Sequence, residues 1–354
     1  MKGIKKFLNH IFIDGLTGMA QGLFATLIVG TILQQIGTLI GGNIGDMIFQ
    51  VSKVAAALTG AGIGVGVACR FKESPLVVVS AAIAGMIGAF ASKLLAGAVL
   101  VDGAIVLAGP GEPLGAFLAA YVGIEVGHLV SGKTKIDILV TPIATIGAGS
   151  VIGLVLGPPI SEFMTALGEL INWGTEQQPF LMGIIVSVLM GMILTLPISS
   201  AALGIILNLS GLAAGAATVG CCCNMVGFAV ASYRENKFGG LVAQGVGTSM
   251  LQVPNIMKKP IIWLPAILSS AILGPIGTMV FKMTNNATGS GMGTAGLVGQ
   301  ITTWQTMIGS ETPTILLMKI LLIQVILPAS VTLLISEIMR KMKLIKYGDM
   351  KLEL

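Results

Sequence analysis

The sequence predicts an all-α fold, a polytopic transmembrane helical bundle of about ten spans (eight to ten) with re-entrant or broken helices. Of its 354 residues, 54% are hydrophobic and only 10% are charged, whereas a soluble domain carries roughly 25% charged residues. Its 49 glycines are about twice the usual share, and glycine lets membrane helices approach closely and lets backbone line a cavity. Long apolar runs recur along the whole chain, and lipid must therefore cover much of the surface.

A membrane-spanning helix needs about 20 mostly apolar residues. The runs that meet or approach this length are Leu16–Ile40, Val51–Cys69, Pro75–Leu95, Leu114–Val130, Ile138–Leu156, Pro179–Leu196, Gly211–Ser232, Pro260–Phe281 and Thr314–Ile338. Four apolar stretches are too short for confident spans, namely Ala96–Ala108, Ser199–Leu209, Leu241–Val253 and Ala287–Ile301. We expect the first of them to dip into the membrane, the second to be a broken crossing, and the third to be an interfacial helix or hairpin.

Charge predicts the orientation, because Lys and Arg concentrate in cytoplasmic loops. Basic clusters occur at Lys2/Lys5/Lys6, Arg70/Lys72, Lys133/Lys135, Arg234/Lys237, Lys258/Lys259 and Arg340 to Lys351. The acidic stretch Ser161–Gln178 and the turn expected at Asn43–Asp46 fall outside. Both termini are therefore predicted to be cytoplasmic, and the first fifteen residues to form a basic interfacial helix.

The chain is expected to be one membrane domain over residues 1–354. It could divide into two halves, with five spans in 1–160 and the C-terminal spans in 178–354. A weak internal echo supports a repeat: Val51–Gly64 and Val280–Gly293 both place a lysine and a Thr-Gly-x-Gly-x-Gly run at the same spacing. Repeats and interrupted helices are common in transporters.

The segment Gly109-Pro-Gly-Glu-Pro113 cannot be a continuous helix, because it holds two prolines and two glycines. Non-helical backbone at membrane depth is tolerated beside a cavity. Glu112 and Gly111 are therefore candidate substrate-binding residues, the alternative being a solvated external loop. Asp102 is a further candidate, because an intramembrane acid indicates function, although Asp102-Gly103 also favours a simple turn.

Two more breaks are predicted, at Thr195-Leu-Pro-Ile-Ser-Ser200 and at Thr288-Gly-Ser-Gly-Met-Gly-Thr294. Their backbone could bind a hydroxylated or anionic ligand, the alternative being flexible loops. The remaining substrate-binding candidates come from these segments and from polar residues near them: Ser199, Asn224, Gly291, Gly293 and Gln300. For Asn224 the alternative is an interhelical hydrogen bond.

Glu125 and His128 lie three residues apart and so share one helix face. We expect either an interfacial ion pair or a gating or proton-linked pair. Gly149, Gly153 and Gly157 form a stripe of small residues on the fifth span, which favours close helix packing. The stripe is a candidate interface for a homodimer.

Several classes of function are disfavoured. Cys221, Cys222 and Cys223 are consecutive within an apolar run, without the spacing of metal ligands, and are expected to be packing residues. The sequence holds no nucleotide-binding P-loop and no basic face on a soluble module for nucleic acid. We expect no catalytic residues, no metal and no cofactor.

The chain resembles the membrane-embedded IIC component of the bacterial sugar phosphotransferase system, and most closely the stand-alone PfoR-type branch of toxin regulators. The resemblance rests on Gly109–Pro113, Thr195–Ser200 and Gly289-Ser-Gly-Met-Gly-Thr-Ala-Gly-Leu-Val-Gly-Gln300. In sugar-transporting relatives a glutamate before a proline binds sugar hydroxyls, a role that Glu112 would inherit. Those relatives carry this motif in the C-terminal half, however, and they use a membrane histidine for which only His128 is available here.

The resemblance implies a multi-pass protein of the bacterial plasma membrane that transports a small polar solute, with a sugar favoured. Its expected partners are the solute, the lipid bilayer, a second copy in a homodimer, and separate cytoplasmic phosphotransferase components, since the chain carries no such domain of its own. Phosphoryl transfer would need those partners, so the chain itself is not expected to be an enzyme. The alternative is a membrane-embedded ligand sensor or regulator without transport.

Overall fold

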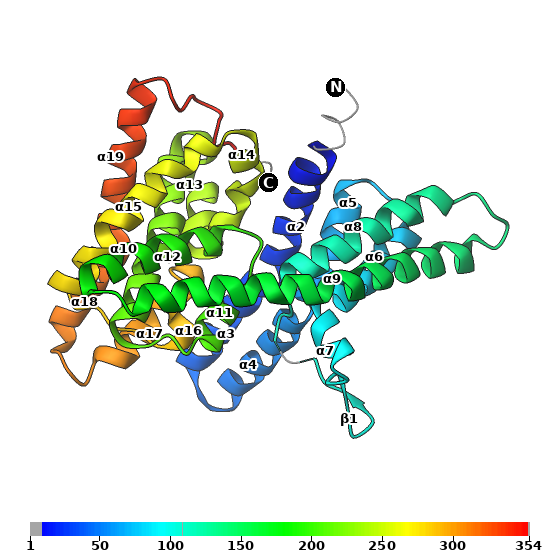
Figure 1. Cartoon of the computed structure of the whole chain (residues 1–354), viewed down its shortest axis with the longest axis horizontal. Helices are drawn as coiled ribbons and strands as arrows, with labels where there is room; N and C mark the ends of the chain where they lie inside the picture. The colour runs from blue at the N-terminus through cyan, green and yellow to red at the C-terminus, as the bar shows by residue number, and fades with distance from the viewer. Residues whose placement is uncertain (1–8, 108, 353–354) are drawn as a thin grey trace. The chain divides into compact units, whose positions relative to one another are not determined.

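The computed structural model describes residues 9–107 and 109–352 and is almost entirely helical. The chain folds into two compact units, residues 1–164 and 165–354. The boundary between them falls inside one long helix (Figure 1). The basic cluster Lys2/Lys5/Lys6 lies outside the described residues, so the structure does not test the interfacial helix expected there.

The first unit and the long helix contain the following elements, where η marks a 3-10 or π-helical turn: η1 His10–Gly15, α2 Leu16–Leu23, η2 Phe24–Ile28, α3 Val29–Ile40, α4 Gly42–Ala57, α5 Thr59–Arg70, α6 Pro75–Ala89, α7 Ala91–Leu95, β1 Leu100–Val101, β2 Ala104–Ile105, α8 Pro113–Val130 and α9 Asp137–Thr175.

The second unit continues with these elements: α10 Pro179–Thr195, α11 Ser200–Ile206, α12 Gly211–Ala231, α13 Tyr233–Val242, η3 Ala243–Gly247, η4 Ser249–Gln252, α14 Val253–Lys258, η5 Pro260–Trp263, α15 Leu264–Pro275, η6 Ile276–Val280, α16 Ala287–Ser290, η7 Ala295–Leu297, α17 Val298–Met307, α18 Pro313–Leu321, η8 Leu322–Ile326 and α19 Leu327–Lys341.

The fold is an all-α membrane bundle, as predicted. Within the described residues, six helical segments are long and apolar enough to cross a bilayer: His10–Ile40, Pro113–Val130, Asp137–Thr175, Gly211–Ala231, Pro260–Val280 and Pro313–Lys341. The pair α4 and α5, bent by 54°, makes a seventh if it counts as one span. The apolar helices α6 and α10 are shorter, and the prediction of eight to ten spans stays a prediction.

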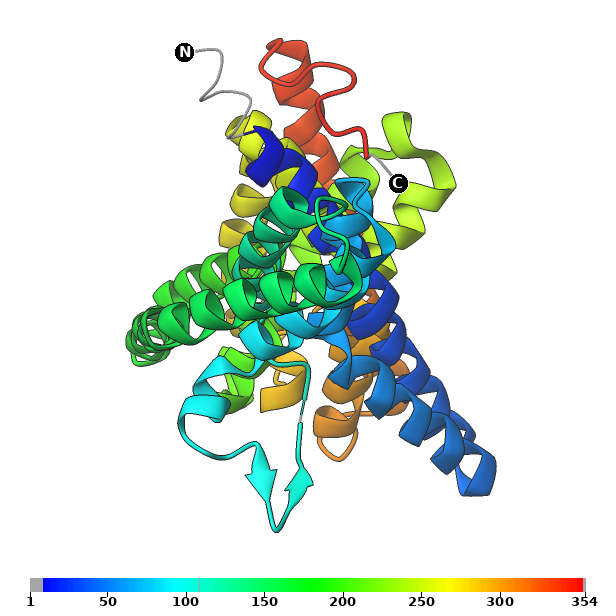
Figure 2. The same cartoon turned by 90° about the vertical axis from the view of Figure 1, so that its right-hand side faces the viewer.

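Glycines hold the helices of the first unit at close range. A Cβ added to Gly18 or Gly22 of α2 would collide with the backbone of α5, and one at Gly60 with the backbone of α6. Gly88 of α6 meets the backbone of α8 at Gly115 in the same way. Helices α3 and α4 also lie side by side (Figure 2). The glycine excess thus serves backbone-to-backbone packing, the main source of helix association where lipid replaces water.

The stripe on α9 packs inside the chain. A Cβ at Gly149 would lie 2.5 Å from the Cβ of Ala84, and one at Gly153 would lie 3.1 Å from the Cα of Gly88. Gly157 faces Ala91 in the same manner, at 2.9 Å. Close packing on this stripe is therefore confirmed, but the expectation that it forms a dimer interface is wrong, because α6, α7 and α8 already occupy the face.

Two local expectations in the first half need correction. Residues 43–46 are not a turn, because α4 begins at Gly42 and the reversal is made by Gly41 and Gly42, both with positive φ. The fifth helix does not end near Leu156 but runs on to Thr175, through Pro158 and Pro159. Proline is tolerated in membrane helices where other groups satisfy the backbone that it frees.

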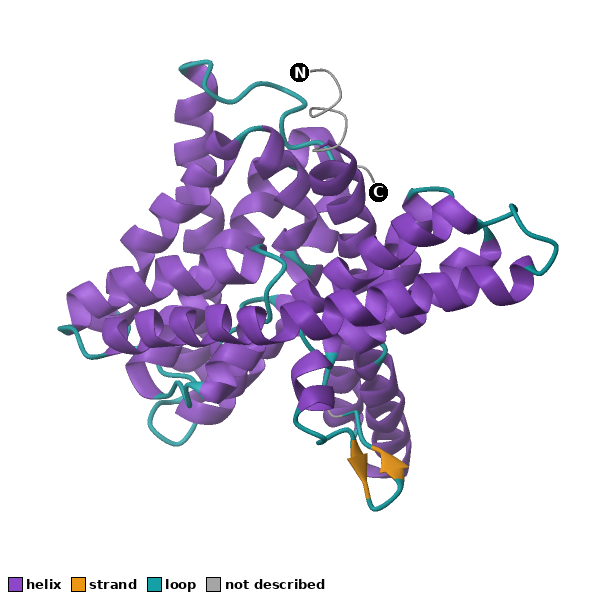
Figure 3. Cartoon of the chain, turned by 45° about the vertical axis from the view of Figure 1, so that its right-hand side comes forward, coloured by secondary structure: helices purple, strands orange, loops and turns teal. Residues whose placement is uncertain are grey.

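The apolar stretch after α7 forms a two-stranded antiparallel hairpin, drawn in orange in Figure 3. Its turn is made by Asp102 and Gly103, which have φ angles of 49° and 79°. Left-handed conformations at both central residues are what a tight hairpin requires, and Asp-Gly supplies them. The hairpin residues are exposed. An open sheet edge is not stable against lipid, so this geometry argues against a dip into the hydrocarbon.

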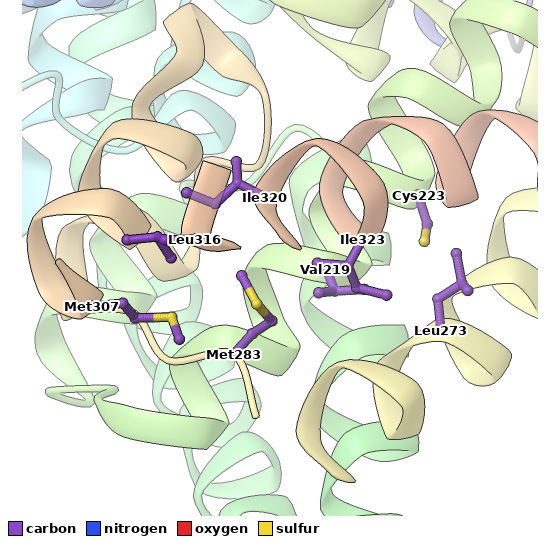
Figure 4. Close-up of a cluster of buried hydrophobic side chains, with 8 residues drawn as sticks. All are labelled: Val219, Cys223, Leu273, Met283, Met307, Leu316, Ile320 and Ile323. Carbon is purple, nitrogen blue, oxygen red and sulfur yellow. The ribbon is translucent and has the colours of Figure 1, made fainter. Parts of the chain in front are cut away.

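The core of the second unit is built around α12, whose side chains are nearly all buried. One cluster of buried hydrophobic side chains joins α12 to the last span and is drawn in Figure 4; it comprises Val219, Cys223, Leu273, Met283, Met307, Leu316, Ile320 and Ile323. The internal echo does not correspond to a structural repeat. Residues 51–64 are helical, whereas residues 281–286 and 291–294 are irregular.

Candidate functional site

Two interrupted segments of the second unit meet beside α12. Helix α10 ends at Thr195, and α11 begins at Ser200 after Pro197 has interrupted the helix. The second segment runs from Met283 through the four-residue helix α16 to α17. Three of its residues have left-handed backbone: Gly293 (φ 52°), Gly296 (φ 53°) and Leu297 (φ 60°). Both predicted breaks are confirmed as breaks.

The two segments are in direct contact. The Ser200 hydroxyl donates to the carbonyl of Gly291 at 2.6 Å. Any Cβ on Gly291 would collide with the Ser200 backbone, so only glycine fits between the segments. The Cys221 thiol of α12 lies within 3.7 Å of the Ser290 carbonyl, and a Cβ on Gly293 would lie 2.7 Å from the Cβ of Cys221. The glycines therefore let irregular backbone approach a buried helix.

Gln300, in the first turns of α17, lies next to this junction. Its amide nitrogen Nε2 donates to the Cys222 sulfur at 3.4 Å, a weak acceptor. Its carbonyl oxygen Oε1 is buried and has no hydrogen-bond partner among the described residues. A buried acceptor without a partner costs roughly 1–3 kcal/mol. Gln300 is therefore the candidate residue best disposed to accept a hydrogen bond from a ligand.

Gln324 is a second buried glutamine beside α17, and it is not among the residues predicted from the sequence. It is fully buried in η8, and its amide donates to the Thr303 hydroxyl of α17 at 2.9 Å. Its Oε1 also lacks a partner within the described chain. Its position inside the apolar run Thr314–Ile338 is the sequence feature that could have identified it, since polar side chains inside membrane spans usually have a function.

Asn224 of α12 uses its full hydrogen-bonding capacity inside the protein. Its Oδ1 accepts from the Thr195 hydroxyl (3.2 Å) and from the Trp263 indole N–H (2.9 Å). Its Nδ2 donates to the Gly220 carbonyl (3.1 Å) and to the Ser270 hydroxyl (3.3 Å). This arrangement favours the interhelical alternative over ligand binding. Ser199 is buried at the start of α11.

The other substrate-binding candidates belong to the first unit. Glu112 precedes α8 and is partly buried, and its backbone N–H donates to the Ala89 carbonyl at 2.8 Å. Gly111 (φ 72°) packs against Ala89 so closely that a Cβ would lie 2.7 Å away. The break at Gly109–Pro113 is thus anchored to the end of α6. Asp102 is exposed at the hairpin tip, which supports the turn alternative.

Glu125 and His128 each pair with a residue from a distant part of the first unit. Glu125 pairs with His10 at 2.9 Å, and the His10 ring stacks on Phe71 at 3.9 Å between centroids. His128 pairs with Glu73 at 3.0 Å. Both arrangements pair a histidine with a carboxylate from a distant part of the chain. A proton-linked role for them stays a prediction.

The three consecutive cysteines are buried in α12 with free thiols. Across residues 9–107 and 109–352, no group of three or more His, Cys, Asp or Glu side chains has the arrangement of a metal site. The groups described at the junction are the Gln300 amide, the Ser200 hydroxyl and backbone carbonyls, which form hydrogen bonds.

Comparison with protein families shows to which family the chain belongs. The model of the family "Phosphotransferase system, EIIC" matches residues 13–352, nearly the whole chain. The chain belongs to this EIIC family. A comparison with curated protein sequences gives no match. Membership makes the chain a permease-like membrane component of the phosphotransferase type and agrees with the resemblance to the IIC component found in the sequence.

Proposed function

We propose that this EIIC protein is a permease for a small hydroxylated solute, with a sugar favoured, and that the solute binds where the two broken segments meet in the second unit. The observation that supports this most is the buried, unpartnered Oε1 of Gln300. A sugar hydroxyl could donate to it and recover the hydrogen bond that the protein itself leaves unmade.

The surroundings of Gln300 support the same proposal. The irregular segment around Gly291 and Gly293 frees backbone groups from helical pairing, and such groups at membrane depth are tolerated where they line a cavity or bind a ligand. Ser199 and Ser200 add hydroxyls at the start of α11. Discontinuous helices of this kind form the midplane binding sites of many transporters.

Glu112, in the first unit, is a separate candidate for solute binding, and it is proposed from that unit alone. Its support is the break at Gly109–Pro113, its partial burial, and the resemblance to sugar-binding glutamates that precede proline. The variant Glu112→Gln keeps the shape of the side chain and removes its charge. We expect it to weaken solute binding about tenfold while expression stays unchanged; unaltered binding would show that Glu112 does not bind the solute.

The cellular setting is proposed from the same family membership. The protein would lie in a bacterial plasma membrane with both termini cytoplasmic, form a homodimer, and work with separate cytoplasmic phosphotransferase components. Reporter fusions after residue 354 and near Glu169 should fall in opposite compartments. Membership of the PfoR-type branch would favour the second candidate function, a ligand sensor that does not transport.

Uptake into proteoliposomes separates the two functions. The purified full chain is reconstituted and offered a panel of radiolabelled monosaccharides, disaccharides and polyols, with and without a cytoplasmic fraction that supplies phosphotransferase components. Accumulation of at least one sugar above protein-free vesicles is the expected result. If no compound accumulates while one of them raises the melting temperature, the protein is a sensor.

A further inference from the structure

An open basic pocket of about 410 Å³ in the second unit lies between α13, the end of α19 and the residues that follow α19. It is lined by Arg234, Arg340, Lys343, Ile345, Lys346 and Tyr347. Four of these six side chains are cationic, and none is acidic. The pocket therefore has the composition of an anion site, and the proposed solute site, a junction of amides and hydroxyls, does not explain it.

The balance of charge around the pocket stays positive after the ion pairs are counted. Arg340 is mostly buried and pairs with Glu235 at 2.9 Å, and Arg234 pairs with Glu337 at 3.0 Å. Lys343 is exposed and has no carboxylate partner within the described residues. Lys346 is exposed as well; its charge acts on Asp349, but the ion pair of that carboxylate is with Lys259. Two exposed lysines without an ion pair of their own in the described chain are thus available to a ligand.

The chain after α19 is held in a fixed path, which makes the pocket preformed. The backbone carbonyl of Met350 accepts hydrogen bonds from Asn236 (2.8 Å) and Gln252 (2.9 Å), and that of Lys351 accepts one from Asn255 (2.9 Å). Met350 is fully buried. We call residues 343–352 the C-terminal strap. Because the strap is bound to α13, η4 and α14, its lysines project from a rigid backbone.

The position of the pocket identifies its ligand. Helix α19 ends the apolar segment Pro313–Lys341, a candidate membrane span, so the residues directly after it lie at the level of the lipid headgroups. Tyr347 is 75% exposed there, and exposed tyrosine is typical of the membrane interface. Basic pockets at this level bind anionic headgroups, and each Lys or Arg contributes roughly a fivefold gain in affinity.

We propose that the pocket formed by Arg234, Arg340, Lys343 and Lys346 binds a phosphate group, supplied by the headgroup of an anionic phospholipid. This inference does not depend on the proposed transport function. The occupied pocket would tie the strap to the membrane surface. Inorganic phosphate shares the chemistry but lacks the acyl chains, which the span beside the pocket would contact.

The test uses the purified full chain in detergent and measures lipid binding by native mass spectrometry and by the shift in melting temperature. The probes are phosphatidylglycerol, zwitterionic phosphatidylcholine and inorganic phosphate. The double variant Lys343→Gln/Lys346→Gln removes the two unpaired charges from the pocket. The matched control, Lys341→Gln/Lys351→Gln, removes two charges from the same region at positions that do not line it.

We expect phosphatidylglycerol to bind the wild type and the control alike, and the pocket variant roughly thirtyfold more weakly. Phosphatidylcholine should not compete. Inorganic phosphate is offered at the same concentration as the lipid. If it stabilises the wild type equally well and not the pocket variant, the pocket is an anion site but its phosphate group does not come from a lipid. The proposal is wrong if the pocket variant binds phosphatidylglycerol as well as the wild type does. It is also wrong if the control variant loses as much phosphatidylglycerol binding as the pocket variant does.

Discussion

Asn224 offers the sharpest test of the distinction between structural and ligand-binding polar groups in the second unit. Replacing it with leucine keeps the branched shape of the side chain but removes its four hydrogen bonds, whose lengths are 2.9–3.3 Å. Side-chain hydrogen bonds between membrane helices are worth about 0.6 kcal/mol each on average. The variant Asn224→Leu should therefore lower the free energy of unfolding by about 2 kcal/mol.

The bond to Trp263 can also be removed from the tryptophan side. Trp263→Phe removes the indole N–H that donates to Asn224 together with part of a ring that packs against a buried hydrophobic cluster, and should cost at least about 0.6 kcal/mol. Trp173→Phe is the matched control, because Trp173 is half exposed on α9, and we expect no loss. Unfolding would be followed by denaturant titration in mixed micelles. Stability of Asn224→Leu within about 0.5 kcal/mol of the wild type, together with weakened solute binding, would contradict the structural role.

Three further predictions follow from packing, backbone and charge. Gly153→Leu should lower the melting temperature without changing the oligomeric state in light scattering, because its face is filled by Gly88; a shift in oligomeric state at wild-type stability would contradict this. Gly293→Ala should abolish solute binding, because φ is +52° and the new Cβ would collide with Cys221. Gly239→Ala is the control and should be neutral, because open space surrounds Gly239; equal effects of the two variants on binding would contradict this expectation. Asp349→Asn should lower the melting temperature at neutral pH, and this difference from the wild type should shrink as pH falls below the ordinary value of 3.8 and vanish only below the lowered pKa.

The sign of the Asp349 prediction comes from its pKa. Burial raises the pKa of this carboxyl, but hydrogen bonds from Lys259 and from the Lys346 backbone, with the charges of both lysines, outweigh burial and hold the pKa below its ordinary value of 3.8. The ion pair therefore stabilises the folded strap above pH 3.8, and the contribution is lost as pH falls through the lowered pKa. A difference that persists unchanged at about pH 3, well below that ordinary value, would show that the charge on Asp349 does not carry the effect.

Features that depend on neighbouring residues in the chain could be predicted from the sequence. All nine long apolar runs are mainly helical in the structure, because a helix pairs the backbone groups that lipid cannot. Two of them are not single helices: Val51–Cys69 is divided between α4 and α5 by a bend of 54°, and Pro75–Leu95 is divided between α6 and α7. The breaks at Pro197 and in the glycine-rich run after Thr288 were predicted, since proline and glycine act on the local backbone. Asp102-Gly103 forms the hairpin turn that was one of its two predicted alternatives.

Features that depend on the tertiary fold could not be predicted. Glu125 pairs with His10, 115 residues away, and not with His128 on its own helix face. The glycine stripe of α9 is compatible with a neighbour in the same chain or in a second copy, and only the fold shows that α6 and α8 fill it. The side chains of Asn236, Gln252 and Asn255 donate to backbone carbonyls of the strap, which lie about one hundred residues further along the chain. Bonds to backbone carbonyls leave no pattern in the sequence.

The most direct test of the central claim is transport by a Gln300 variant. Gln300→Leu replaces the amide with an apolar side chain of similar size, so it removes the unpartnered Oε1 together with the weak Nε2 bond to Cys222. Gln178→Leu is the control, because Gln178 is exposed outside the junction. For the sugar that the wild type accumulates, proteoliposome uptake should show a KM raised about tenfold in Gln300→Leu, the value of one lost hydrogen bond, and an unchanged KM in Gln178→Leu. Wild-type uptake by Gln300→Leu would contradict the placement of the solute at this junction.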